Sequence, residues 1–331
     1  GGKFGGSGYK VSGGLHGVGS SVVNGLSEWV EVEVTQNGHI YSQRFERGNP
    51  VNDLHIIGDS DGHGTYIKFK PDGEIFTETL VYDFEVLSRR LREQAFLNAG
   101  LSITLTDLRE SDSEEQRSEE YCYEGGIRSF VEYINKSRGL NPIQNEVIHI
   151  STTKEDRSAE VALCYTDSYN EILLSFANNI NTIDGGTHET GFKTALTRVF
   201  NDYGKKFNIL KDSDKKLSGD DVREGLTAIV SVKLTEAQFE GQTKGKLGNT
   251  DITGLVSSMV YEKLMTYFEE NPQTAKTILN KALDASRARE AARKARDSAR
   301  NKSGLENTKL PGKLADCSSN EPELCEIYIV E

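Results

Sequence analysis

The chain has 331 residues, of which 39 are Lys or Arg and 51 are Asp or Glu, so its formal charge is −12. That length exceeds what one hydrophobic core usually serves and predicts at least two domains. A hydrophobic fraction of 36% argues against a disordered chain, and no run approaches the ~20 apolar residues of a membrane-spanning helix. The four Cys are scattered without a C-x-x-C pair, which argues against a zinc ribbon or a disulfide scaffold and favours the cytoplasm.

In chain order, residues 20–108 are predicted to form helices and mostly antiparallel strands. Strict alternation of Val and Glu in Trp29–Gln36 indicates a half-buried strand, and Asn37-Gly38 is a hairpin signal. The remaining predicted elements are a helix over Ser20–Leu26, a return strand around Ile40–Arg44, a strand over Thr65–Phe69, a helix around Phe84–Ala95 and a strand over Leu101–Leu108. This order favours an α+β sandwich over a doubly wound sheet.

Residues 109–120 are dense in charge and predict a solvated loop at a domain seam. A second α/β unit follows, with helices over Gly126–Arg138 and Thr187–Asp202 and strands near Val147–Ser151, Ala159–Tyr165, Ile172–Ala177 and Leu226–Lys233. From Gly254 the pattern is helical, with an interruption at Asn271-Pro272, until Gly304 and Pro311-Gly312 predict a linker. Leu324–Val330 reads as an apolar strand.

Glycine is concentrated at the start, where Gly13-Gly14-Leu15-His16-Gly17-Val18-Gly19 leads into the first predicted helix. Glycines let backbone N–H groups approach a ligand, and a helix N-terminus favours negative charge, so the segment predicts a phosphate cradle flanked by Lys3 and Lys10. The spacing fits neither a Walker A loop nor the dinucleotide fingerprint. The alternative is a flexible surface loop.

Several motifs resemble the gyrase B family of bacterial DNA gyrases, which belongs to the ATPases shared with Hsp90, MutL and sensor histidine kinases. The matching segments are Gly1–Phe4, Tyr9–Gly19, Gly64-Thr65, Tyr123–Ile127, Asp184–His188, Gly219–Leu226, Gln242–Leu247, Ala288–Arg293 and Pro311–Cys317. The nearest competitor is the ParE-type component of topoisomerase IV. The resemblance implies part of a GHKL-type ATPase sandwich over residues 1–115. It also implies an α/β transducer domain of the ribosomal S5 domain 2 type over 116–300 with long C-terminal helices, a linker over 301–322 and the start of a TOPRIM domain over 323–331.

The function implied by this resemblance is that of an ATP-hydrolysing type II DNA topoisomerase, which negatively supercoils DNA by ATP-gated double-strand passage. The implied partners are double-stranded DNA, gyrase A in a heterotetramer of two gyrase A and two gyrase B chains, and a second copy of the chain in an ATP-dependent dimer formed through the N-terminal region. No membrane is involved. The rival from another class is a non-catalytic scaffold.

The resemblance also assigns nucleotide-site residues. Lys3 and Lys10 would contact the triphosphate, Tyr9 the base, and Thr65 the hydrogen-bond network around the adenine. Gln242 and Lys244 would touch the γ-phosphate as catalytic groups; the alternative for Lys244 is an ordinary exposed lysine. Backbone N–H groups that would cap the phosphates come from Gly14, Leu15, His16, Gly17, Val18 and Gly19.

Parts of the family's machinery lie outside this sequence. The resemblance places the carboxylate that activates water, the Mg²⁺-binding Asn and the Asp that reads adenine before Gly1. We therefore expect the chain alone to be an inactive fragment. Glu331 matches the first acidic residue of the TOPRIM metal site, but a lone carboxylate is a poor Mg²⁺ ligand set.

Basic residues cluster near the other end. Residues 281–313 hold ten Lys or Arg and four Asp or Glu, a local charge of +6. Arg289, Arg293, Arg296 and Arg300 fall on one helical stripe, and Ala285–Ala299 supply a second, small-residue stripe. The arginines predict contacts with DNA phosphates. The alternative is a solvated face with pairs such as Glu290–Lys294.

Overall fold

The computed structural model describes residues 17–109, 116–211, 215–306, 319 and 321–326. Its first sheet is built by five strands: β1 (Ser27–Gln36), β2 (His39–Glu46), β3 (Asn49–Pro50), β4 (His55–Asp59) and β5 (Gly64–Pro71). The order is β3-β2-β1-β5 with β4 also paired to β2, and every pairing is antiparallel. The predicted hairpin is confirmed, since Asn37 and Gly38 both have positive φ, 54° and 82°, as a type I′ turn requires. The strands β3 and β4 were not predicted.

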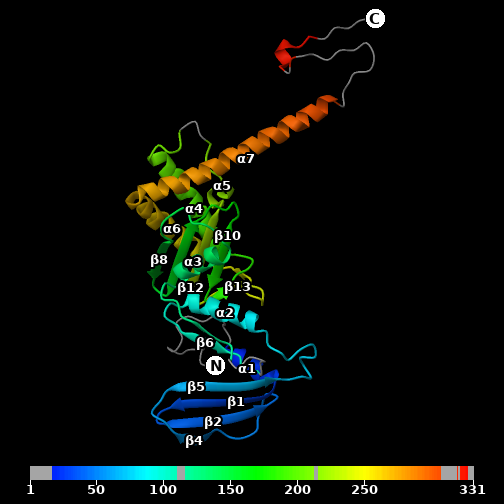
Figure 1. The fold of residues 1–331 in the computed structure, drawn as a ribbon, viewed down its shortest axis with the longest axis vertical. Helices are drawn as coiled ribbons and strands as arrows, with labels where there is room; N and C mark the ends of the chain where they lie inside the picture. Colours follow the sequence, from blue (N-terminus) through cyan, green and yellow to red (C-terminus); the bar gives the residue numbers. More distant parts are fainter. Residues whose placement is uncertain (1–16, 110–115, 212–214, 307–318, 320, 327–331) are drawn as a thin grey trace.

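A connecting segment follows the first sheet (Figure 1). It holds α2 (Phe84–Leu97) and the hairpin of β6 (Ile103–Thr106) with β7 (Ser118–Tyr121). The prediction that 109–120 is a loop is wrong for 118–120, because charged residues there find partners in the fold: the Glu119 carboxylate accepts hydrogen bonds from Arg92, Arg117 and the Tyr121 hydroxyl. The expected boundary between residues 115 and 116 therefore falls between two paired strands.

The second sheet has the order β11-β10-β12-β9-β8, and its central strand β12 is buried on both faces. Its strands are β8 (Ile148–Lys154), β9 (Arg157–Tyr165), β10 (Ile172–Ala177), β11 (Ile180–Asn181) and β12 (Leu226–Lys233). Only β10 and β12 run parallel, joined by a crossover through α4 (Thr187–Lys206) and the short α5 (Gly219–Arg223). Ala162, Cys164 and Ile229 face α3 (Ile127–Ser137) and the end of α2.

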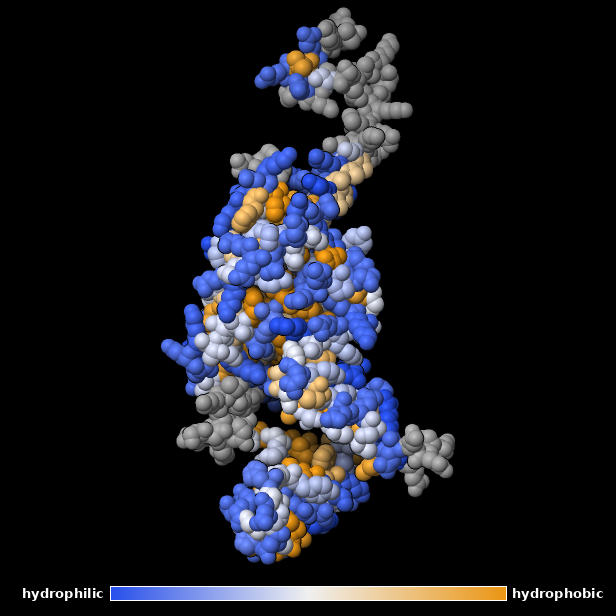
Figure 2. Space-filling model, turned by 60° about the vertical axis from the view of Figure 1, so that its left-hand side comes forward, coloured by the Kyte–Doolittle hydropathy of each residue, from blue (hydrophilic) through white to orange (hydrophobic). Residues whose placement is uncertain are grey.

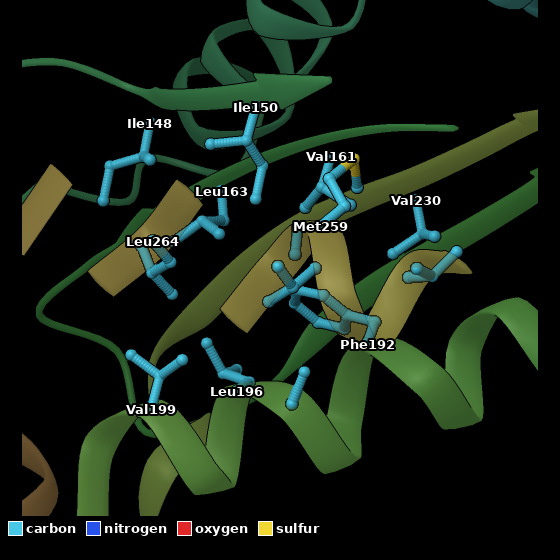
Figure 3. Packing of buried hydrophobic residues seen from close by; sticks show 14 of the residues in the cluster. Ile148, Ile150, Val161, Leu163, Phe192, Leu196, Val199, Val230, Met259 and Leu264 are labelled. Carbon is cyan, nitrogen blue, oxygen red and sulfur yellow. The ribbon is translucent and has the colours of Figure 1, made fainter. Parts of the chain in front are cut away.

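The opposite face of this sheet carries the larger core. Figure 3 shows Phe192, Leu196 and Val199 of α4 pointing toward the sheet, with Met259 and Leu264 of α6 (Thr250–Glu270) beside them. After β12, a small hairpin of β13 (Phe239–Glu240) and β14 (Lys246–Leu247) precedes α6. The predicted α+β class is confirmed.

The last long helix is α7 (Pro272–Glu306), whose far end projects beyond the body in Figure 1. The expected break at Gly304 is wrong: a single glycine costs about 1 kcal/mol, which does not by itself end a helix. The first six residues of the predicted linker are therefore helical. Leu324 lies in the 3₁₀ turn η1 (Pro322–Leu324), not in a strand, and residues 327–331 lie outside the described part. Within the described residues, no helix is long and apolar enough to cross a membrane.

Candidate functional site

One face of the first sheet is apolar and open. The strand register places Val30 between Phe45 and Phe69, and Val32 beside Ile67. Val30 is buried, yet Ile67 is 55% and Phe69 42% exposed. Apolar residues gather in the hollow between this sheet and the upper body in Figure 2. Exposed apolar residues gathered in this way are typical of a surface that binds a ligand or packs against another segment.

The short helix α1 (Gly19–Gly25) borders this face. A pocket of about 560 Å³ lies between them, and its lining residues are Ser20, Ser21, Val23 and Asn24 of α1 together with Val30, Val32, Phe45, Ile67 and Phe69 of the sheet. Phe69 and Val23 also line a second pocket of about 300 Å³ on the side of Pro71 and Tyr82. Planar apolar groups fit pockets of this size and lining.

Three residues of the predicted phosphate cradle, Gly17–Gly19, directly precede the α1 residues that line this pocket. Gly17 has a φ of +63°, a conformation that favours glycine, and Val18 and Gly19 lead directly into α1. Thr65 pairs with Val34 on the open face, two residues along the strand from Ile67, and is exposed. Thr65 thus lies on the open face, and Gly17–Gly19 lie at the start of the helix that borders this face. The other predicted residues, Lys3, Tyr9, Lys10, Gly14, Leu15 and His16, lie outside the described residues.

Gln242 and Lys244 lie in the β13–β14 loop, residues 241–245. Gln242 is exposed and Lys244 partly buried. Lys244 adopts a left-handed backbone conformation with φ 57°, and its N–H points to the Gly241 carbonyl at 3.4 Å. This conformation is strained for a lysine, so its surroundings fix it.

The loop is fastened to the turn that begins α4. The Asp184 N–H donates to the Gly245 carbonyl at 2.9 Å, and the Leu247 N–H donates to the Gly185 carbonyl at 3.1 Å. The preceding turn, between β10 and β11, reaches α2 through Asn179, whose carbonyl accepts from Gln94 at 3.2 Å. The loop therefore sits at the end of the second unit nearest the connecting segment.

The predicted arginine stripe divides into two parts. Arg289 forms two hydrogen bonds with the Asp221 carboxylate, at 2.7 and 2.8 Å, and so fastens α7 to α5. Burial alone would raise the pKa of Asp221, but the hydrogen bonds from Arg289 and Ser218 lower it. Glu290 pairs with Lys215 at 2.8 Å rather than with Lys294.

Beyond that fastening, residues 291–300 are exposed on every face, and we call them the basic arm. The basic arm carries four basic residues and one acidic residue, and Arg293, Arg296 and Arg300 belong to it. Of the predicted alanine stripe, Ala285 is buried, while Ala288, Ala292, Ala295 and Ala299 are exposed. The arm is an exposed stretch of helix with a net positive charge.

No group of three or more His, Cys, Asp or Glu in the described residues could hold a metal ion. Glu331, the predicted metal residue, lies outside them. The described residues therefore do not by themselves fit a Mg²⁺ site.

Comparison with known proteins identifies the relationship. A family model described as DNA gyrase B matches residues 126–298. The chain is 54% identical to the DNA gyrase B protein of Bacillus mycoides over 331 residues, which cover all of this chain and 80% of that protein. The chain belongs to the DNA gyrase B family. It is also 60% identical to the gyrase B protein of Clostridium acetobutylicum, of which it covers 51%. The chain likewise spans about half the length of the gyrase B proteins of Halalkalibacterium halodurans and Enterococcus faecalis.

Solved structures agree with this membership. The 43K ATPase domain of Thermus thermophilus gyrase B, in complex with an aminocoumarin, is 41% identical with a TM-score of 0.73, over 85% of this chain and 75% of that one. The topoisomerase IV ATP-binding domain of Francisella tularensis, in complex with a small-molecule inhibitor, is 30% identical with a TM-score of 0.70, over 84% and 75%. The predicted relationship to the gyrase B family is thus confirmed.

Sequence reasoning missed two contacts in this gyrase B chain. One is the Asp221–Arg289 pair, although Ser218 and Asp221 have the spacing of a capping box, which the structure forms. The other is the fastening of the β13–β14 loop to residues 184–186. The glycines there were a usable signal, because adjacent glycines mark close backbone approach.

Proposed function

We propose that this chain supplies the ATP-responsive part of a type II DNA topoisomerase that negatively supercoils DNA by ATP-gated double-strand passage. ATP is the substrate that the first sheet would receive, with the base near Thr65 and the phosphates near Gly17–Gly19. The observation that carries the proposal is the placement of Lys244 on a loop fixed to α4, away from the sheet that holds Thr65. A nucleotide contacted by both would join the two units.

Lys244 would act by electrostatics. Phosphoryl transfer needs stabilisation of charge spread over the γ-phosphoryl oxygens, and an ammonium group held in a fixed loop supplies it without reorganisation. Gln242, two residues away, would add a neutral donor. Because the described residues do not fit a Mg²⁺ site, we assign no step to a metal ion.

Membership of the gyrase B family supports supercoiling with a gyrase A partner over the topoisomerase IV alternative. The DNA partner is supported by the basic arm, since exposed arginines at helical spacing attract phosphates. A dimer formed through the N-terminal region is also part of the proposal. The discriminating assay pairs the full-length protein, meaning this chain extended to the length of its relatives, with gyrase A or with the corresponding topoisomerase IV protein and measures supercoiling of relaxed plasmid.

The experiment that tests the nucleotide role is Lys244→Ala in the full-length protein. We expect ATP turnover to fall about 10²–10³-fold, as for loss of one fixed electrostatic donor, with ADP affinity nearly unchanged. The matched control is Lys246→Ala, which removes the same charge two residues away, where the side chain pairs with Glu240. Turnover equal to that of the unaltered protein in Lys244→Ala would make Lys244 an ordinary surface lysine.

A further inference from the structure

The β13–β14 loop cannot hold its own shape. Its two strands are two residues long and share the pairs Phe239–Leu247 and Glu240–Lys246. Isolated hairpins are marginal in water even when longer. The position of Lys244 must therefore be set by whatever the hairpin packs on.

That support is the turn of residues 184–186, which we call the docking turn. Besides its two hydrogen bonds to Gly245 and Leu247, Gly186 forms a parallel bridge with Leu247. A Cβ atom on Gly186 would lie 2.5 Å from the Leu247 carbonyl oxygen and 2.6 Å from its nitrogen. Backbone atoms cannot rotate away as a side chain can, so only glycine permits this approach. The φ of +144° at Gly186 adds a second reason for glycine.

The docking turn is held in place by α4 and α6. The Thr190 N–H donates to the Gly186 carbonyl at 3.0 Å, so the turn continues directly into α4. A Cβ on Gly191 would lie 2.6 Å from the Thr253 carbonyl oxygen, which shows how closely α4 crosses α6. The Thr253 hydroxyl also donates to the Thr187 carbonyl at 3.2 Å. A movement of the docking turn would therefore also move α4 and disturb its packing against α6.

We propose that Gly186, together with the Asp184–Gly245 contact, positions Lys244 for the γ-phosphate, so that the docking turn determines turnover without touching the nucleotide. This inference rests on the proposed function of Lys244. Gly186 is a positioning residue: it acts only through the place of the loop. Because the docking turn continues into α4, a displacement of the β13–β14 loop would be transmitted to the second unit through α4.

The first test is Gly186→Ala in the full-length protein. We expect kcat for ATP hydrolysis to fall about 10²-fold, the cost of misplacing a group by about 1 Å, while KM for ATP changes far less. Gly254→Ala is the matched control, because a Cβ on that α6 glycine meets nothing within 4 Å. Unchanged kcat in Gly186→Ala would overturn the proposal.

The second test combines the substitutions. If Gly186 acts only through the loop, Gly186→Ala in a Gln242→Ala, Lys244→Ala background, which lacks both proposed donors of the loop, should cause no further loss of kcat. A further loss of about 10²-fold would mean that Gly186 acts by another route and would overturn the proposal. Wild-type turnover in Lys244→Ala alone would instead refute the proposed function itself, so the two failures are distinguishable.

A third test does not depend on Gly186→Ala folding. A Cβ on Gly245 would meet only the Asp184 Oδ2 atom at close range, and this exposed side chain can rotate away, so Gly245→Ala should leave kcat nearly unchanged. Asp184→Pro instead removes the N–H that donates to the Gly245 carbonyl and should lower kcat by freeing the loop. Unchanged kcat in Asp184→Pro would contradict positioning by this contact.

Discussion

His188, at the start of α4, should make the stability of the second unit depend on pH. The ring is fully buried. Its Nε2 atom lies 3.1 Å from the Thr182 hydroxyl, which donates its own proton to the Ser175 carbonyl, so Nε2 is the donor and we assign the neutral Nε2–H tautomer. The Nδ1 atom is buried without a partner, so a second proton there would have no acceptor. Burial accordingly lowers the pKa of His188 from 6.5 to about 4, although Glu189 nearby opposes the shift.

The size of this change in the free energy of unfolding follows from the two pKa values of His188. Between these two pKa values the unfolded chain binds a proton that the folded chain does not, so stability is complete above about pH 6.5 and is lost as the pH falls toward 4. At 1.36 kcal/mol per pKa unit the whole effect is about 3 kcal/mol, of which about 2 kcal/mol is lost by pH 5. That is a large part of the stability of an ordinary domain.

The assay is urea denaturation at pH 7.5 and pH 5.0, followed by circular dichroism at 222 nm. This signal reports the helices of the second unit, whereas fluorescence of the single tryptophan, Trp29 in β1, reports the first sheet. His188→Gln is neutral at both pH values and keeps a donor for Thr182, so its loss of stability at pH 5.0 should be about 2 kcal/mol smaller. Other titrating groups are common to both proteins and cancel. Equal pH dependence in the two proteins would refute the reasoning.

Two further predictions concern the basic arm and the α4–α6 crossing. Replacing the arm's three arginines by Gln in the full-length protein should flatten the dependence of log K for duplex DNA on log salt by up to about 0.9 per lost phosphate contact, measured by fluorescence anisotropy. Arg289→Gln should leave that slope unchanged, because Asp221 holds the side chain, and equal slopes for all three proteins would make the arm a solvated face. Gly191→Ala should lower the free energy of unfolding by about 1–3 kcal/mol through overpacking against Thr253, whereas Gly254→Ala should not. A Gly191→Ala variant as stable as the parent protein would show that α4 and α6 can separate at no cost.

The sequence by itself determined the elements whose signals are local. The alternation in Trp29–Gln36, the Asn37-Gly38 turn and the Pro at 272 depend on neighbours a few residues away, and each predicted element appears in the structure. Family membership could also be inferred from the sequence, because the motifs are contiguous runs. Short elements such as β4 and β13 were missed, since two to five residues carry too little periodicity to be distinguished from a loop.

Only the tertiary structure decided what each motif contacts. Arg289 and Asp221 are 68 residues apart, so no local pattern could assign the arginine to a carboxylate rather than to DNA. The approach of Leu247 to Gly186 joins segments 61 positions apart, and together with the positive φ at 186 it explains why glycine is required there. Side-chain spacing along a chain determines which face a residue occupies. The packing of distant segments, which depends on the shape of the whole core, determines what that face meets.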